Sequence, residues 1–532
     1  MKHFKIIIEP EGEQIFIHEG ATLLEAAGQA NIILNTFCGG LGTCKKCYVY
    51  IGPENRKVLA CQYHIQSDLT ITIPSESRYI TQKILEQGIK VEKEISPTIY
   101  EKYINVASIE NIFGVAIDVG TTTVVAKLMN LADGKCHETA SALNPQTQFG
   151  DDVISRIAYA DSEENMKNLQ KLIIDCINDL IKKLCEKASI NTEHIFEMCI
   201  VGNTTMNHIF LGFPVTQLGI APYQAYSLDA VDLPAGKSGL KINPQGNIHA
   251  VENIAGYVGS DTIAAAMVTD IASTDKITLI VDIGTNGEIV LGNKEKIYAA
   301  SCAAGPAMEG ARIDCGSRAF DGSIEAVVVN DRDIDFDVIG SSPAKSICGS
   351  GLIDAVAVLL NLGILDQTGK FTDPDSLREK LPNAIYSRLR QNDSEQAFYF
   401  NENVYLSQKD IRQLQLAKAA ILTGIKILLK KFDIKEKDIE QVFLAGAFGN
   451  YIRKESALRI GLLPKVDTER IHFIGNAAAS GAQMILLSDE ARQKAGQLAK
   501  KIQYIEIAHQ PDFQDIFTDS LSFFSFFFES IV

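Results

Sequence analysis

Four cysteines near the start of the chain are the side chains best suited to chemistry. Cys38, Cys44, Cys47 and Cys61 follow the spacing Cys-x5-Cys-x2-Cys-x13-Cys. A [2Fe-2S] cluster needs four thiolates that converge on two irons, and a tight loop that carries three of them meets this need. Glycines at positions 39, 40 and 42 let the backbone wrap closely, with amide N–H groups directed at the cluster sulfurs. The pattern therefore predicts an electron carrier with these four cysteines as its metal ligands.

Two other uses of these cysteines are a structural zinc site and disulfide bonds. Zinc sites usually combine two Cys-x2-Cys pairs, and this segment contains one. Residues 1–30 are charged throughout and lack the apolar stretch and cleavage site of a secretory signal. The remaining cysteines lie in apolar or glycine-rich surroundings, as in a reducing compartment. We therefore expect a cytoplasmic protein that holds a cluster at this site.

Two related segments farther along the chain have the residues of phosphate-binding loops. In each, an apolar strand ends in an aspartate, and a glycine turn with polar side chains leads into a second apolar strand. Backbone N–H groups of such turns bind phosphate oxygens, and the aspartate holds Mg²⁺ or orients the attacking water. We assign Asp118 and Asp282 as catalytic residues, and which of them holds Mg²⁺ stays open. The predicted phosphate-binding residues are Gly120, Thr121, Thr122 and Thr123 in the first loop and Gly284, Thr285, Asn286 and Gly287 in the second.

The repetition of this segment predicts two duplicated lobes that face one nucleotide. Three further segments follow in the order found in the actin, Hsp70 and sugar-kinase (ASKHA) superfamily, which they resemble. Residues 253–262 and 474–482 resemble its two connecting helices, where small residues allow close contact and hinge motion, and residues 441–449 resemble its adenosine motif. A Gly-Ser-Gly turn before a predicted helix is a further phosphate or ribose site. The nucleotide-binding residues expected in these segments are Gly349, Ser350, Gly351, Gly446 and Gly449.

The segments around the cysteines predict how they are positioned. Residues 5–9 and 14–18 alternate as a hairpin, and residues 69–73 form a closing strand. A helix over residues 21–27, capped by Thr22, lies between them. This order resembles the β-grasp fold of plant- and adrenal-type ferredoxins, although the fourth cysteine comes sooner here.

The whole chain is therefore expected to be an α/β multidomain protein, in which a linker joins the ferredoxin-like domain to a two-lobed actin-like ATPase domain. The expected boundaries are residues 1–78 for the [2Fe-2S] ferredoxin-like domain, 79–110 for the linker, 111–262 for the first lobe, and 263–532 for the second lobe and C-terminal segment.

Composition and charge exclude two classes of partner. The chain has 532 residues and a net charge of −16, which argues against binding to nucleic acid. Its apolar runs stay below the ~20 residues that a membrane-spanning helix needs. We expect the Phe-rich residues 521–528 to form a buried strand or helix that docks on the core. Arg412, Gln415 and Lys418 lie on one predicted helix and either contact nucleotide or form a solvated face, which is the favoured interpretation.

Over nearly its full length the chain resembles the reductive activators of corrinoid enzymes, which are iron–sulfur ATPases of anaerobes. The resemblance implies a [2Fe-2S] cluster, ATP and Mg²⁺ as cofactors. It implies an enzyme that transfers an electron to the cob(II)alamin of a corrinoid protein or cobalamin-dependent methyltransferase and restores cob(I)alamin. A low-potential electron donor and a homodimer are also implied. The segments that carry the resemblance are residues 117–123, 144–146, 152–156, 281–288, 302–306 and 410–420.

Three alternative functions stay open. An ATP-switched activator of the 2-hydroxyacyl-CoA dehydratase type is also an iron–sulfur ATPase, but it lacks a ferredoxin module. A redox-regulated small-molecule kinase would need a catalytic base beside a sugar or acid pocket, and we identify no such base in the sequence. A partner-binding protein that uses ATP as a switch, as Hsp70 does, leaves the cysteines unused. Electron transfer to a corrinoid protein accounts for both the cysteines and the paired loops.

Overall fold

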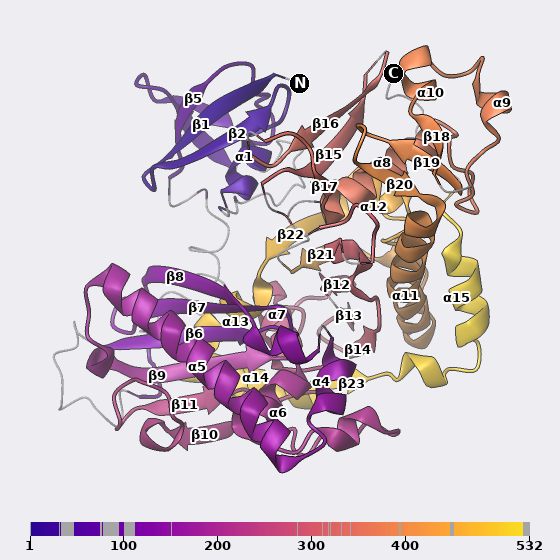
Figure 1. Ribbon diagram of the computed structural model, residues 1–532. Coiled ribbons are helices and arrows are strands. Elements are labelled where there is room, and N and C mark those ends of the chain that lie inside the picture. The colour runs from indigo at the N-terminus through magenta and orange to yellow at the C-terminus, as the bar shows by residue number, and fades with distance from the viewer. Residues whose placement is uncertain are drawn as a thin grey trace.

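Three α/β units follow one another along the chain, as Figure 1 shows: a small N-terminal domain in indigo, a first lobe in magenta and a second lobe in red to orange. None of the helices in the described parts of the chain is long and apolar enough to cross a membrane. The computed structural model describes residues 2–30, 32, 34, 47–74, 77, 95–99, 112–150, 152–284, 286–310, 312–317, 319, 321–330, 332–340, 342–392, 395–446 and 452–524.

The N-terminal domain is a five-stranded sheet in the order β2-β1-β5-β3-β4 that packs against one helix, α1. Its central strands β1 and β5 are parallel, whereas β1 and β2 form an antiparallel hairpin. This is the strand order of the β-grasp fold, which is consistent with the predicted fold of this domain. As predicted, Thr22 caps the helix, because its Oγ1 accepts the Glu25 N–H at 3.2 Å. The elements are β1 (His3–Glu9), β2 (Glu13–His18), α1 (Leu23–Gln29), β3 (Tyr48–Ile51), β4 (Arg56–Leu59) and β5 (Leu69–Thr72).

The two lobes repeat one sheet topology. In the first lobe, the antiparallel strands β8-β7-β6 are continued by β9 and β11, which run parallel to β6. In the second, β14-β13-β12 are continued in the same way by β21 and β22. The predicted duplication is therefore confirmed. The strands are β6 (Phe113–Val119), β7 (Thr123–Asn130), β8 (Cys136–Leu143), β9 (Ile195–Gly202), β10 (Val231–Pro234), β11 (Asn247–Ala250), β12 (Thr278–Ile283), β13 (Gly287–Gly292), β14 (Ile297–Cys302), β21 (Gln441–Ala445), β22 (Ile471–Gly475) and β23 (Ile502–Tyr504).

Helices cover both faces of the first sheet, which lies between two cores. Successive side chains of a strand point to opposite faces. On β6, Val115 and Ile117 therefore pack in an outer core with α5. Ala116 belongs instead to an inner core that both sheets share with α7 and α13. The helices of this part are α4 (Val153–Tyr159), α5 (Glu163–Ala188), α6 (Thr204–Leu211), α7 (Ser260–Thr269), α13 (Ala477–Leu487) and α14 (Asp489–Lys501).

Helices α7 and α13 are the two predicted connecting helices, and they pack against each other between the lobes. A Cβ at Gly481 would lie 2.3 Å from the Ala264 carbonyl oxygen, so this contact requires glycine. Helix α13 follows the second sheet in sequence but packs on β6 and β9 of the first sheet. The first sheet ends at Ala250 and the second begins at Thr278, so α7 contains the predicted boundary between residues 262 and 263.

The second lobe carries two small additional sheets and a long helix, α11. Ser407 and Asp410 form the predicted capping box at the start of this helix. Helix α15 packs along α11, as Figure 1 shows in yellow and brown. The elements are β15 (Ser323–Val329), β16 (Ile334–Val338), β17 (Ser346–Ile347), α8 (Gly349–Asn361), α9 (Pro374–Leu377), α10 (Asn383–Tyr386), β18 (Leu389–Asn392), β19 (Glu395–Tyr399), β20 (Tyr405–Ser407), α11 (Gln408–Phe432), α12 (Lys454–Arg459) and α15 (Phe513–Leu521).

Of the polar residues on α11, Arg412 is exposed, as a solvated face predicts, but Gln415 and Lys418 are buried and line no nucleotide cavity, so both interpretations are wrong for these two. Lys418 is fully buried, and its Nζ donates to the Ser522 carbonyl oxygen. The Gln415 side-chain amide donates to the Leu521 carbonyl oxygen at 2.9 Å. Arg412 donates to the Thr368 carbonyl oxygen. Lys418 and Gln415 therefore fasten the start of the Phe-rich C-terminal segment, of which residues 525–532 lie outside the described residues.

One short part of the predicted linker is anchored on the first lobe. Ser96 forms a bridge with Ser488, and the Thr98 hydroxyl donates to Asp489 Oδ1 at 3.1 Å, at the start of α14. Ile99 is buried in the inner core. Residues 79–94 and 100–110 of the linker lie outside the described residues.

Candidate functional site

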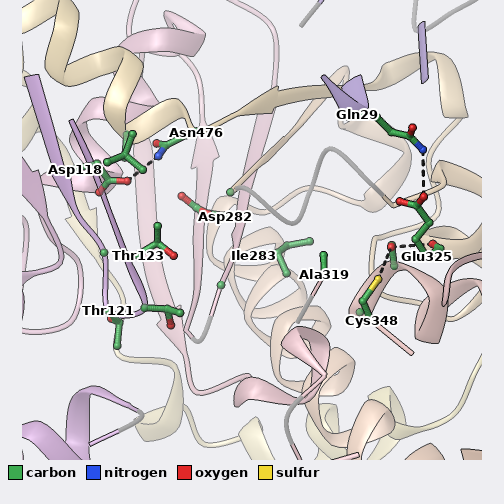
Figure 2. A pocket seen from close by; sticks show the side chains of 18 of the residues that line it. Gln29, Asp118, Thr121, Thr123, Asp282, Ile283, Ala319, Glu325, Cys348 and Asn476 are labelled. Carbon is green, nitrogen blue, oxygen red and sulfur yellow. Dashed lines mark hydrogen bonds between the residues drawn. The ribbon is translucent and has the colours of Figure 1, made fainter. Parts of the chain in front are cut away.

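The two aspartate loops face a single cavity of about 800 Å³ between the lobes (Figure 2). Each loop follows the first strand of its sheet, so the duplicated topology brings them together. Thr285 and Gly449, which were also predicted to bind nucleotide, lie outside the described residues. The predicted residues that line this cavity are Asp118, Gly120, Thr121, Thr122, Thr123, Asp282, Gly284, Asn286, Gly349, Ser350 and Gly446.

Two of these glycines are required by close approach. A Cβ at Gly120 would lie 2.6 Å from the Thr123 carbonyl oxygen, which accepts the Gly120 N–H at 3.0 Å. Gly446 has a φ of +91°, and its Cβ would lie 2.7 Å from Asp282 Oδ1. A side chain at either position would therefore displace a loop or a carboxylate of the site.

Three side chains of the first lobe hold the first loop in place. Asn144 Nδ2 donates to the Gly120 carbonyl oxygen, and Asn203 Nδ2 donates to Thr121 Oγ1, both at 2.9 Å. Arg156 is fully buried, and its guanidinium donates to the Thr121 carbonyl oxygen. These contacts occupy two carbonyl groups and one hydroxyl of the loop and so fix its conformation. Asn203, which follows β9 directly, also lines the cavity. It was not among the predicted site residues, although the polar residues after this apolar strand could have indicated it.

Two predicted nucleotide-binding glycines, Gly287 and Gly351, do not line the cavity. A Cβ at Gly287 would lie 2.8 Å from Cys302 Sγ and 3.0 Å from the Ile421 side chain. A Cβ at Gly351 would lie 2.3 Å from the Ile324 carbonyl oxygen. Both glycines allow close packing inside the second lobe, so their assignment to nucleotide is corrected.

Five carboxyl groups line the cavity, and four of them, Asp118, Asp261, Asp282 and Glu288, lie close enough to interact with one another, whereas Glu325 lies apart from them. Burial raises the pKa of Asp118 to about 7, although the Asn476 amide, which donates to Asp118 Oδ2 at 2.9 Å, opposes this shift. Burial and the neighbouring carboxylates raise the pKa of Asp282 to about 7. Burial also raises the pKa of Asp261 and of Glu288.

Such mutual repulsion between buried oxygen ligands fits a divalent cation, and Mg²⁺ prefers carboxylate oxygens. The type of donor suits the predicted Mg²⁺, although no three carboxyl groups of the described residues are placed as one metal-binding group. Asp261 and Glu288 were not among the predicted site residues, although each lies in a segment that the motif comparison included. Asp261 and Glu288 could have been recognised in the sequence as charged residues within runs of small or apolar residues.

The start of α8 offers backbone donors to the same cavity. No side chain caps this helix at Cys348, and the first N–H groups of an α-helix have no helical acceptor. Gly349 and Ser350 of this first turn line the cavity, which fits an anion. The Ser350 hydroxyl donates to the Glu325 carbonyl oxygen at 2.9 Å. The backbone of this turn, rather than the serine hydroxyl, is therefore available for a phosphate or ribose.

Two of the four predicted cluster ligands lie in the described residues. Cys47 and Cys61 are buried at the ends of the β3–β4 hairpin, and their Sγ atoms are 3.3 Å apart. The Gln62 side-chain amide is directed at Cys61 Sγ, at 3.8 Å. Converging thiols with an amide donor beside them fit a metal cluster. Cys38 and Cys44 lie outside the described residues.

The paired sheets, the two crossing helices and the shared acidic cavity define an ASKHA-type protein that carries a β-grasp domain at its N-terminus. A sequence model of the C-terminal ASKHA domain of RACo matches residues 276–530. A model of the RACo middle region matches residues 113–274. The chain therefore belongs to the RACo family, the reductive activators of corrinoid proteins.

Individual relatives agree with this assignment over most of the chain. The corrinoid activation enzyme RamQ of Eubacterium limosum is 32% identical, and the match covers 95% of this chain and 96% of that protein. The [Co(II) methylated amine-specific corrinoid protein] reductase of Methanosarcina barkeri is 24% identical over 78% of this chain and 77% of its own. A solved structure of a reductive activator for corrinoid,iron-sulfur protein superposes with a TM-score of 0.71, at 31% identity, and covers 98% of both chains.

Proposed function

We propose that this chain is an ATP-dependent reductive activator that acts as a homodimer. It takes one electron from a low-potential donor and passes it to the cob(II)alamin of a corrinoid protein or cobalamin-dependent methyltransferase, which returns to cob(I)alamin. The observation that carries the proposal is the single cavity that both aspartate loops face, in a chain of the RACo family. The names of two relatives, an activation enzyme and a reductase, support the choice of acceptor.

We assign electron transfer to the cysteine site. When bound, a [2Fe-2S] cluster supplies a centre that takes up and releases one electron. Cys38, Cys44, Cys47 and Cys61 would hold it, and the Gln62 amide beside Cys61 Sγ stabilises negative charge on that sulfur.

The cavity is assigned to ATP. Backbone N–H groups after Asp118, after Asp282 and at the start of α8 bind the phosphates. The carboxylates of the cavity would hold Mg²⁺, whose charge offsets that of the phosphates. Asp118 or Asp282, whichever does not hold Mg²⁺, would accept a proton from the attacking water. Because the electron transfer is uphill, the nucleotide states must bind the corrinoid partner with different affinity.

An anaerobic titration tests this proposal. A corrinoid protein in the cob(II)alamin state is mixed with the holo protein and a chemical reductant, with and without ATP. The absorbance of cob(I)alamin should grow only when ATP is present. Asp118→Asn and Asp282→Asn should abolish the ATP-driven part while the visible cluster spectrum stays unchanged. Equal reduction with and without ATP, or full activity of both variants, would contradict the nucleotide assignment.

A further inference from the structure

A lysine of the first sheet lies beside the acidic cavity without lining it. Successive side chains of a strand point to opposite faces, so Thr123, Val125 and Lys127 of β7 share one face. Thr123 and Val125 line the cavity, whereas Met129, the next residue on this face, packs in the inner core. Lys127 therefore lies at the boundary between the cavity and the inner core, where it is partly buried.

The register of the first sheet places this lysine next to the first aspartate. Asp118 of β6 pairs with Val125, and Ala116 pairs with Lys127, so Asp118 and Lys127 are diagonal neighbours on one face. Diagonal neighbours are about 7–8 Å apart, which is within reach of a long side chain. Burial raises the pKa of Asp118 and lowers the pKa of Lys127, and the charge of each group opposes the shift of the other. The two charges therefore stabilise each other.

The charge balance of the cavity gives this cation a role. Five carboxyl groups line the cavity, and among the described residues that line it none is basic. Buried like charges repel one another, and carboxylates attract a divalent cation. Arg156 lies behind the first loop, but its guanidinium donates to the backbone carbonyl oxygens of Thr121 and Gly150. Lys127 thus adds a resident positive charge beside the interacting carboxyl groups.

We propose that Lys127 is a positioning residue of the nucleotide site, whose ammonium balances the charge of the carboxyl groups until a metal–nucleotide complex binds. The inference rests on the proposed assignment of the cavity to ATP and Mg²⁺. The positive charge of Lys127 lowers the affinity of the carboxyl groups for a free divalent cation, and it raises the affinity of the cavity for the negatively charged nucleotide. The cavity therefore takes up Mg²⁺ together with the nucleotide rather than before it.

Two binding measurements on the holo protein test this inference without any reaction. The first titrates Mn²⁺, a paramagnetic substitute for Mg²⁺, in the absence of nucleotide, and follows the EPR signal of the free ion. The second titrates ADP by calorimetry in the presence of a chelator. Lys127→Met removes the charge and keeps a side chain of similar length. It should bind Mn²⁺ about tenfold more tightly and ADP about tenfold more weakly, the order expected for one unit charge in a partly buried site.

Opposite changes in the two dissociation constants distinguish a charge effect from a structural one, because damage to the cavity would weaken the binding of both ligands. Lys127→Arg keeps the charge and should keep both constants near those of the unmutated protein. Lys135→Met is the matched control for net charge, because the Lys135 side chain is 77% exposed in the turn between β7 and β8. It should leave both constants unchanged.

For Lys127→Met, any result other than tighter binding of Mn²⁺ with weaker binding of ADP would overturn this inference alone. Failure of the unmutated protein to bind ADP or ATP would overturn the proposed function as well.

Discussion

Replacing Gly446 with alanine tests whether the turn after β21 and the second aspartate loop form one site. The backbone at Gly446 has a φ of +91°, and the added Cβ would lie 2.7 Å from Asp282 Oδ1 and from the Ile283 carbonyl oxygen. Ordinary contact begins at 3.4 Å, so the carboxylate must move by about 0.7 Å. The left-handed backbone costs a further ~1–2 kcal/mol. The variant should fold with reduced stability and with Asp282 displaced.

A displacement of this size is large for a catalytic group. A misplacement of about 1 Å can lower a rate about 100-fold, so we expect ATP turnover by Gly446→Ala to fall more than about tenfold. Gly363→Ala is the matched control, because Gly363 has a φ of +69° with no atom within 4 Å of the added Cβ. It carries the backbone cost alone and should keep normal turnover. Equal ATP turnover in the two variants, measured as phosphate release, would refute the placement of Asp282 in the site.

Two further predictions concern the other parts of the molecule. Cys47→Ser should remove the visible [2Fe-2S] absorbance, whereas Cys136→Ser, at an exposed cysteine on β8, should keep it; an unchanged spectrum in both would mean other ligands. Burial lowers the pKa of Lys418 from 10.5 to about 7, so the unfolded chain binds more protons than the folded one between these values. Stability should therefore rise from pH 7 upward, by at most about 1.4 kcal/mol per pH unit. Lys418→Met should raise the thermal midpoint at pH 7 and flatten its dependence up to pH 9, and a parallel pH profile in both proteins would contradict the buried cation.

Local patterns were sufficient to predict the elements and the centre of the site. Alternation and capping predicted the hairpin and helix of the β-grasp domain, and the repeated aspartate loops predicted the duplicated sheets. These features depend on residues close together in sequence. The convergence of Asp118 and Asp282 followed because two copies of one topology place equivalent loops at equivalent positions.

Roles that depend on distant neighbours were not predictable in this way. The helical period of α11 places Lys418 on a face, but it does not show that the C-terminal segment covers that face. A glycine in a turn can serve phosphate binding or close packing, and the sequence does not distinguish the two roles. Only the structure shows that Gly287 packs against Cys302 and Gly351 against Ile324. The docking of the N-terminal domain depends on acids of β15 and β16, some 300 residues away along the chain.

The path of α13 and α14 has a consequence for synthesis of the protein. The first sheet is complete at Ala250, and α7 follows it directly, but α13 and α14, which cover the rest of its inner face, end only at Lys501. A ribosome adds about 5–20 residues per second, so roughly 10–50 s pass between synthesis of this apolar face and synthesis of the helices that pack on it. During this interval Ala116, Met129 and Val201 have no permanent partner from α13. We therefore expect the first lobe, although it is translated early, to complete its inner core late, and a chaperone that shields this face would act in that interval.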